Sequence, residues 1–160
     1  MISGDTYYTH KKIKIHTFNL TISNVHLVET DGKQILIDAC LPGKEKEIID
    51  KLNGIGYILE DIDLIILTHG HADHAGGASY FQHTYKIPVI VGAGDSAMLA
   101  NGHNDTLVRH TFLDRMVRKY IATEDRFSPF TPNILVQDSL DLKRFGINGR
   151  ITRFIHLVHC

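Results

Sequence analysis

One short apolar run, Leu64 to Thr68, narrows the range of folds open to this chain more than any other segment. A strand whose consecutive residues are apolar is covered on both faces, as in parallel sheets that lie between other layers. The preceding segment, Lys44 to Leu52, places Ile48, Ile49 and Leu52 at helical spacing. A helix that leads into a buried strand indicates a layered α/β fold.

Two dipeptides predict hairpin turns. Asp31-Gly32 tolerates the positive φ angles of a tight turn and leads from the second expected strand, Val25–Val28, into Gln34–Asp38 in an antiparallel meander. Asn148-Gly149 carries the same signal between expected strands at Leu140–Phe145 and Arg150–Val158. The other expected elements are strands at Ile13–Phe18, Val25–Val28, Gln34–Asp38 and Val89–Val91, helices at 75–85, 96–99 and 105–121, and a loop at 123–133.

The composition indicates an ordinary soluble domain. The 160 residues carry 17 Lys and Arg against 18 Asp and Glu, so the net charge of −1 favours neither nucleic acid nor another polyanion as partner. Apolar runs fall far short of the ~18 residues of a membrane span, and the N-terminal residues lack a secretory signal, so we expect a cytoplasmic protein. The 11 histidines point to metal or acid–base chemistry.

The histidines concentrate directly after the buried strand. His69 and His71 are two residues apart, so in an extended backbone their side chains point the same way and can converge on one metal ion. Asp73 and His74 are expected to face a second metal position, about 3.5–4 Å away in a dinuclear centre. Solvent-exposed loop histidines are the alternative, but four potential ligands within six residues after a buried strand argue against it. Gly76 and Gly77 allow the next helix to begin close to the site, because they have no Cβ atom.

The segment His69-Gly70-His71-Ala72-Asp73-His74 resembles the His-x-His-x-Asp-His signature of the metallo-β-lactamase fold hydrolases. This resemblance implies an αββα sandwich with the metal ions at one edge, between two sheets. It implies that His69 and His71 bind one ion together with a later His, while Asp73 and His74 bind the other. The strand ending in Asp38 also resembles the family, and there the carboxylate would hydrogen-bond a metal-bound His.

The resemblance covers nearly the whole chain as a single domain, residues 1–160, which corresponds to about the first two-thirds of the family fold. The third histidine ligand is expected to be His159, with His156 as the alternative, and a terminal histidine without a role stays open. The later bridging Asp and final His would lie beyond Cys160, so the sandwich is expected to be incomplete at its C-terminal half. Exposed apolar area would then favour homo-oligomers, and we expect about one zinc ion per chain at most.

Three functions follow from these residues. The first is a hydrolase in which an activated water, held by Asp73, attacks an ester, thioester, lactone, β-lactam or phosphodiester bond of a small-molecule substrate. Zinc suits imidazole ligands best, although iron or manganese is compatible with them. The second is a truncated relative that binds one metal ion or none and is catalytically impaired. The third and weakest is a nucleotide-binding module at Gly92-Ala93-Gly94, between a strand and a helix.

Overall fold

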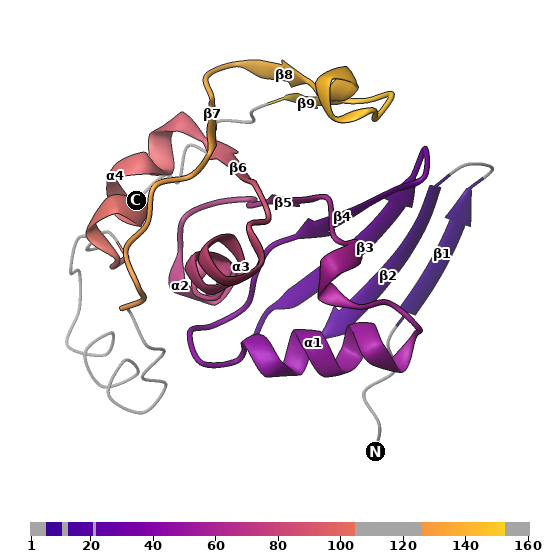
Figure 1. The fold of residues 1–160 in the computed structure, drawn as a ribbon. Coiled ribbons are helices and arrows are strands. Elements are labelled where there is room, and N and C mark those ends of the chain that lie inside the picture. Colours follow the sequence, from indigo (N-terminus) through magenta and orange to yellow (C-terminus); the bar gives the residue numbers. More distant parts are fainter. Residues whose placement is uncertain (1–5, 11–12, 21, 105–125, 153–160) are drawn as a thin grey trace, which may run out of the picture.

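A computed structural model describes residues 6–10, 13–20, 22–104 and 126–152, and its centre is a seven-stranded mixed sheet (Figure 1). The strands follow chain order across the sheet, from β1 at one edge to β7 at the other. Strands β1 to β4 are antiparallel neighbours, whereas β4 to β7 are parallel. The strands are β1 (Thr6–His10), β2 (Ile13–Asn19), β3 (Asn24–Thr30), β4 (Lys33–Ile37), β5 (Leu64–Ile66), β6 (Val89–Gly92) and β7 (Ile134–Val136).

The antiparallel half contains the predicted hairpin. Strands β3 and β4 pair from Thr30 opposite Lys33 to His26 opposite Ile37, with Asp31-Gly32 as the turn. Both turn residues have positive φ angles, 52° and 75°. The turn is therefore confirmed, and β1 adds an edge strand that the sequence analysis did not predict.

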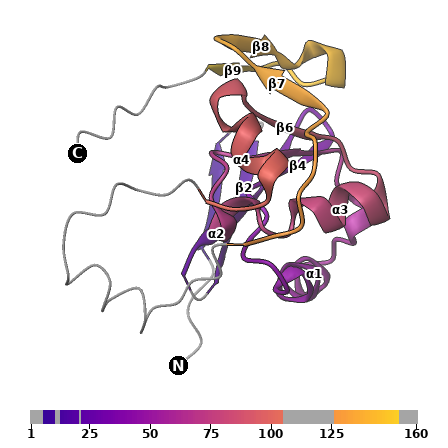
Figure 2. The same cartoon turned by 90° about the vertical axis from the view of Figure 1, so that its left-hand side faces the viewer.

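Helices cover one face of the sheet, as Figure 1 and Figure 2 show for α1 (Glu45–Gly54) and α3 (Ala78–Tyr85). Leu64 and Ile65 of β5 alternate in direction and both are 0% exposed, so the prediction of a strand covered on both faces is confirmed. The core between the helices and the sheet includes Phe18, Val25, Leu27, Leu36, Ile48, Leu52, Ile65, Phe81, Val89 and Leu99.

A small ribbon covers part of the opposite face. It consists of β8 (Ser139–Asp141), the 3₁₀ helix η3 (Leu142–Phe145) and β9 (Arg150–Thr152). The apolar residues packed together between ribbon and sheet are Ile35, Leu64, Ile90, Val136, Leu142 and Ile147. Helices on one face and strands on the other confirm the predicted layered α/β class.

The predicted second hairpin needs correction. Leu140 does pair with Ile151, but most of the expected strand Leu140–Phe145 is the helix η3. Asp141 Oδ1 caps this helix by accepting a hydrogen bond from Lys143 N, and Gly146, at φ 77°, ends it. The local capping signals override strand formation, so the connection is longer than a two-residue turn. Residues 153–158 of the other expected strand lie outside the described residues.

The predicted helix at 75–85 is two helices, because α2 (Ala72–Ala75) precedes α3. The expected helix at 96–99 is confirmed as α4 (Ser96–Asn101), which follows the 3₁₀ helix η2 (Ala93–Asp95), and a further 3₁₀ helix is η1 (Leu59–Asp61). The helix expected at 105–121 lies outside the described residues. Within the described part of the chain, no helix has the length and apolar character needed to cross a membrane.

A polar network joins β2, β3 and the end of α1. Glu29 Oε1 lies 2.6 Å from Lys14 Nζ and 3.3 Å from His16 Nε2, and Lys14 Nζ donates to Tyr57 Oη at 3.3 Å. Burial raises the pKa of the Glu29 carboxyl, but hydrogen bonds from Lys14, Tyr57 and His16 outweigh burial and leave this pKa below its usual value of 4.5. A depressed pKa stabilises the folded chain above that value.

Glu29→Gln is therefore expected to lower the free energy of unfolding near neutral pH, by at most about 1 kcal/mol because the ion pair is partly exposed. The difference from the unchanged protein should shrink as the pH falls below 4.5 and through the lower folded-state pKa. Urea unfolding at a series of pH values measures it. Glu60→Gln, at an exposed position of η1, is the control, and an equal pH dependence in both variants would contradict the assignment.

Candidate metal centre

The histidine-rich segment begins three residues after β5, and Asp38 directly follows β4. These strands are parallel neighbours, with Ile37 opposite Ile66. Parallel strands end at a common edge of the sheet, and in α/β sheets ligand sites lie outside that edge. Asp38 N donates to Ile66 O at 3.0 Å, so the two segments are joined where the strands end.

Three side chains form a group that can hold a metal ion. One potential ligand atom each from His69, His71 and Asp73 lies within 4.8 Å of the others, and all three residues are half-buried. The ring centroids of His69 and His71 are 4.7 Å apart, and those of His69 and His74 are 4.2 Å apart. The Asp73 carboxylate lies near His69 and His71 and also 3.3 Å from His74 Nε2, so its expected place at a second metal position stays a prediction.

The donor set fits a small divalent ion. Zinc binds imidazole nitrogen and carboxylate oxygen at about 2.0–2.2 Å, which puts neighbouring ligand atoms of a tetrahedral site about 3.4 Å apart. Ligand atoms within 4.8 Å reach that separation through small side-chain rotations. Two imidazoles and a carboxylate also leave a tetrahedral ion one open position, as catalytic zinc sites require.

Asp38 orients His74. Its side chain is buried, and it accepts hydrogen bonds from Thr68 N at 2.8 Å, from Thr68 Oγ1 at 2.9 Å and from His74 Nδ1 at 2.8 Å. A carboxylate only accepts, so His74 carries a proton on Nδ1 and its Nε2 faces Asp73. The hydrogen bond to Asp38 raises the pKa of His74, although burial acts in the opposite direction.

Thr68 extends this orientation to His69. Its hydroxyl donates to Asp38, so its oxygen is left to accept from His69 Nδ1 at 3.1 Å, and Nε2 of His69 stays available as a ligand. Burial lowers the pKa of His69, and the neighbouring His74 and His71 lower it further, so its imidazole is neutral near pH 7. Thr68 was not among the residues expected to take part in the site. Its only signal was a polar residue at the end of an apolar strand.

Gly76 and Gly77 bring the segment against the loop that follows Asp38. Gly77 N donates to Ala39 O at 3.0 Å, and a Cβ atom on Gly77 would overlap that same oxygen. A Cβ atom on Gly76 would overlap the ring and nitrogen of Pro42. These glycines were expected to let the next helix begin close to the site, and the close approach that they permit is to the 39–42 loop.

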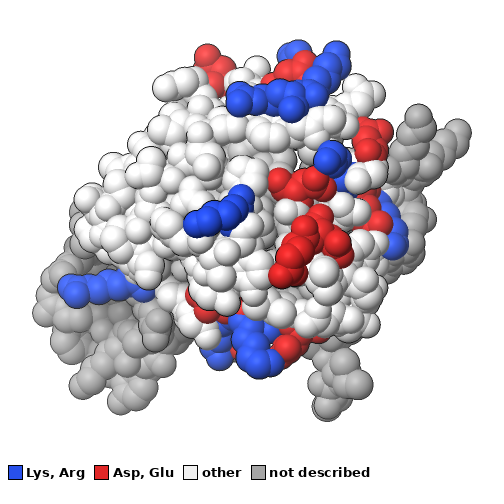
Figure 3. Space-filling view, viewed as in Figure 1, with Lys and Arg blue, Asp and Glu red and all other residues white. Residues whose placement is uncertain are grey.

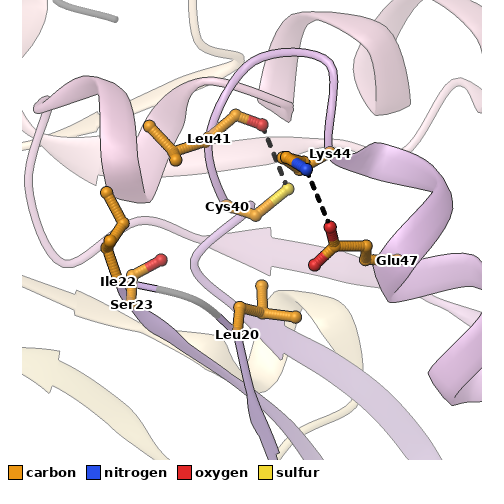
Figure 4. A pocket seen from close by; sticks show the side chains of 7 residues that line it. All are labelled: Leu20, Ile22, Ser23, Cys40, Leu41, Lys44 and Glu47. Carbon is orange, nitrogen blue, oxygen red and sulfur yellow. Dashed lines mark hydrogen bonds and ion pairs between the residues drawn. The ribbon is translucent and has the colours of Figure 1, made fainter. Parts of the chain in front are cut away.

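Three further residues could take part in metal binding or catalysis by their chemistry, namely two C-terminal histidines and Cys40. His159 and its alternative His156 lie outside the described residues. Cys40 is buried beside a shallow pocket drawn in Figure 4, where Sγ donates to Leu41 O at 3.3 Å. Burial raises the pKa of the Cys40 thiol far above its usual value, with Glu45 and Glu47 adding to the shift, so Cys40 is not a nucleophile at neutral pH.

Asp38→Asn is expected to weaken metal binding by about 10–100-fold, the usual effect of losing a partner behind a metal ligand. An amide nitrogen in place of Oδ2 donates to Thr68 Oγ1, so the Thr68 hydroxyl donates to His69 Nδ1 instead of accepting from it, which moves the imidazole proton to Nε2 and removes the ligand lone pair. Competition with a chromophoric chelator measures the affinity. Asp63→Asn is the matched control. Asp63 also accepts a hydrogen bond, from Gln34 N at a distance of 2.9 Å, but it lies outside the metal site. Equal affinities in the two variants would show that Asp38 does not set the tautomer.

Comparison with known proteins places the chain in a family. The model of the metallo-beta-lactamase superfamily matches residues 19–159. A UPF0173 metal-dependent hydrolase of Cupriavidus metallidurans is 35% identical over 130 residues, which are 80% of this chain and 35% of the relative. Exodeoxyribonuclease YycJ of Bacillus anthracis is 36% identical over 66 residues, which are 41% of this chain and 24% of that protein.

The solved structure of BJP-1, a subclass B3 metallo-beta-lactamase of Bradyrhizobium japonicum, superposes with a TM-score of 0.63 and 22% sequence identity. The match covers 78% of this chain and 42% of that chain, and it shows a shared fold. The chain belongs to the metallo-beta-lactamase superfamily, which confirms the resemblance drawn from the motif. It spans about a third of the hydrolase relative and less than half of the lactamase.

Proposed function

We propose that this chain carries the metal centre of a metal-dependent hydrolase, with His69, His71 and Asp73 as ligands. The observation that supports it best is the convergence of their ligand atoms within 4.8 Å at the carboxyl edge of the sheet. Two relatives with metal-dependent hydrolase or nuclease names are consistent with the proposal. Zinc is the proposed ion, because two imidazoles and a carboxylate suit it, and iron or manganese is compatible with the same ligands.

A divalent ion in this site would supply a hydroxide nucleophile near neutral pH by lowering the pKa of a coordinated water to about 7. The protein groups have separate tasks. His69, neutral because of burial, offers Nε2, and its Nδ1 is held by Thr68. The Asp73 carboxylate, half-buried beside the imidazoles, would accept a hydrogen bond from the attacking water and carry its proton toward the leaving group.

His74 belongs to a proposed second position. Its Nε2 lies 3.3 Å from Asp73 Oδ2, so His74 and Asp73 together would hold a second ion. Asp73 and His74 alone do not close a tetrahedral ligand set, so we expect about one zinc ion per chain. His159 remains the proposed third histidine beside His69 and His71, and these three imidazoles would hold the first ion with one position open for water while Asp73 serves the second position.

The substrate is an open choice between two chemical classes. A small molecule with an ester, thioester, lactone or β-lactam bond is the first candidate. A phosphodiester is the second, because relatives are named exodeoxyribonucleases. The exclusion of nucleic acid by net charge is therefore not retained. On the face drawn in Figure 3, basic and acidic side chains of the described residues are interspersed.

Metal analysis and a hydrolysis screen test the proposal. Freshly purified protein is expected to contain about one equivalent of zinc, and its activity should disappear with a chelator and return with zinc. The screen includes nitrophenyl esters, a chromogenic β-lactam, bis(p-nitrophenyl) phosphate and a single-stranded oligonucleotide. Zinc without hydrolysis would support the alternative of a catalytically impaired relative. Hydrolysis that resists the chelator would overturn the metal mechanism.

A further inference from the structure

Two side chains outside the histidine-rich segment hold its backbone. Asp95 Oδ1, at the end of η2, accepts a hydrogen bond from Gly70 N at 3.2 Å. Asn104 Oδ1, shortly after α4, accepts from Ala72 N at 2.7 Å. These amides belong to the residues that alternate with His69, His71 and Asp73. Both acceptors come from the part of the chain between β6 and residue 105, far from the motif in sequence.

The two amides require these acceptors. Gly70 and Ala72 are buried, and a buried N–H without a partner is destabilising. Gly70 also lets Asp95 approach, because a Cβ atom at this position would lie 3.1 Å from Asp95 Cβ and 3.3 Å from Met98 Sδ. The contact with Asp95 is therefore built into the packing of the loop and is not an incidental surface contact.

Fixing alternate amides determines where the intervening side chains point. His71 is extended, at φ −70° and ψ 151°, and α2 begins at the next residue. A bond on each side of His71, at Gly70 N and at Ala72 N, limits rotation of the backbone that carries its imidazole. The same bonds set the direction of His69 before the pair and of Asp73 after it.

We propose that Asp95 and Asn104 are positioning residues that clamp the 69–73 backbone in the conformation that brings the three ligands together. The expected effect of the clamp on metal affinity rests on the proposed metal site, because the clamp would preorganise the ligands of that site. The clamp itself is a property of the metal-free chain. Only the acceptor oxygens are needed, so the negative charge of Asp95 is dispensable.

The experiment compares Asp95→Ala and Asn104→Ala, which remove the acceptors, with Asp95→Asn and Asn104→Asp, which retain them. Cobalt(II) affinity and the visible spectrum of bound cobalt report the ligand arrangement. Each alanine variant is expected to bind cobalt about 10–100-fold more weakly with an altered spectrum. The acceptor-retaining variants should rescue both properties. Asp141→Ala removes an equivalent side-chain cap on the distant ribbon and should bind cobalt normally.

Amide hydrogen exchange in the metal-free protein separates the clamp from the metal site. Asp95→Ala is expected to accelerate exchange at Gly70, and Asn104→Ala at Ala72. Unchanged exchange at both positions overturns the clamp, whether or not cobalt binds. If exchange accelerates but the unchanged protein binds no cobalt, the clamp stands and the proposed function fails. Asn104 lies after α4 in a half-buried position, so Asn104→Ala decides the matter if Asp95→Ala does not fold.

Discussion

Replacement of both His69 and His71 by alanine is expected to reduce bound zinc from about one equivalent to nearly none and to bring hydrolysis down to background. These residues supply two of the three ligand atoms that lie within 4.8 Å, and a lone carboxylate does not retain the ion. Metal analysis and initial rates on the substrate identified in the screen measure the effect. Circular dichroism and thermal unfolding of the metal-free proteins should show that the fold persists.

His83→Ala is the control for this double variant. His83 is an exposed residue of α3, where its Nδ1 lies 2.8 Å from Ser79 O, and it is not part of the ligand group. Full metal content and activity are expected for this change. Turnover that survives the loss of both His69 and His71 would refute the assignment of the reaction to this site.

Gly76→Ala is expected to destabilise the protein strongly, although alanine has a higher helix propensity than glycine. Gly76 has ordinary helical angles, φ −57° and ψ −40°, so alanine is favoured locally by about 1 kcal/mol. A Cβ atom would nevertheless overlap Pro42 and Ala72 O, and backbone atoms do not move aside as a flexible side chain does. We expect a loss near the upper end of the range of about 1–3 kcal/mol for overpacked sites, with a melting temperature lower by about 5–10 °C.

Gly54→Ala provides the matched comparison. Gly54 ends α1 without a positive φ, and nothing lies within 4 Å of its added Cβ atom. This variant is expected to be as stable as the unchanged protein or slightly more stable. Thermal and urea unfolding of the metal-free variants measure both effects. If Gly76→Ala unfolds at the same temperature as Gly54→Ala, the close approach of the 39–42 loop is not required for stability.

The fold could be predicted from the sequence where a local pattern of residues is compatible with only one local structure. The apolar run after residue 63 and the Asp31-Gly32 turn correctly predicted a buried parallel strand and a hairpin. The same reasoning was wrong at Leu140–Phe145, because Asp141 and Gly146 favour a capped 3₁₀ turn over strand pairing. A strand as short as β7 has too few residues to show the alternation of apolar and polar side chains from which a strand is predicted.

For the candidate site, the sequence by itself determined which ligands are available and in what order, because His69, His71, Asp73 and His74 are close neighbours along one turn of chain. Only the tertiary structure decided which groups orient them. Asp38, Asp95 and Asn104 reach the segment across 36, 25 and 32 residues, respectively. Such hydrogen bonds form only because the ends of β4, β5 and β6 lie at one edge of the sheet. The spacing of residues along the sequence does not show which strand ends lie together, so these partners could not be predicted from it.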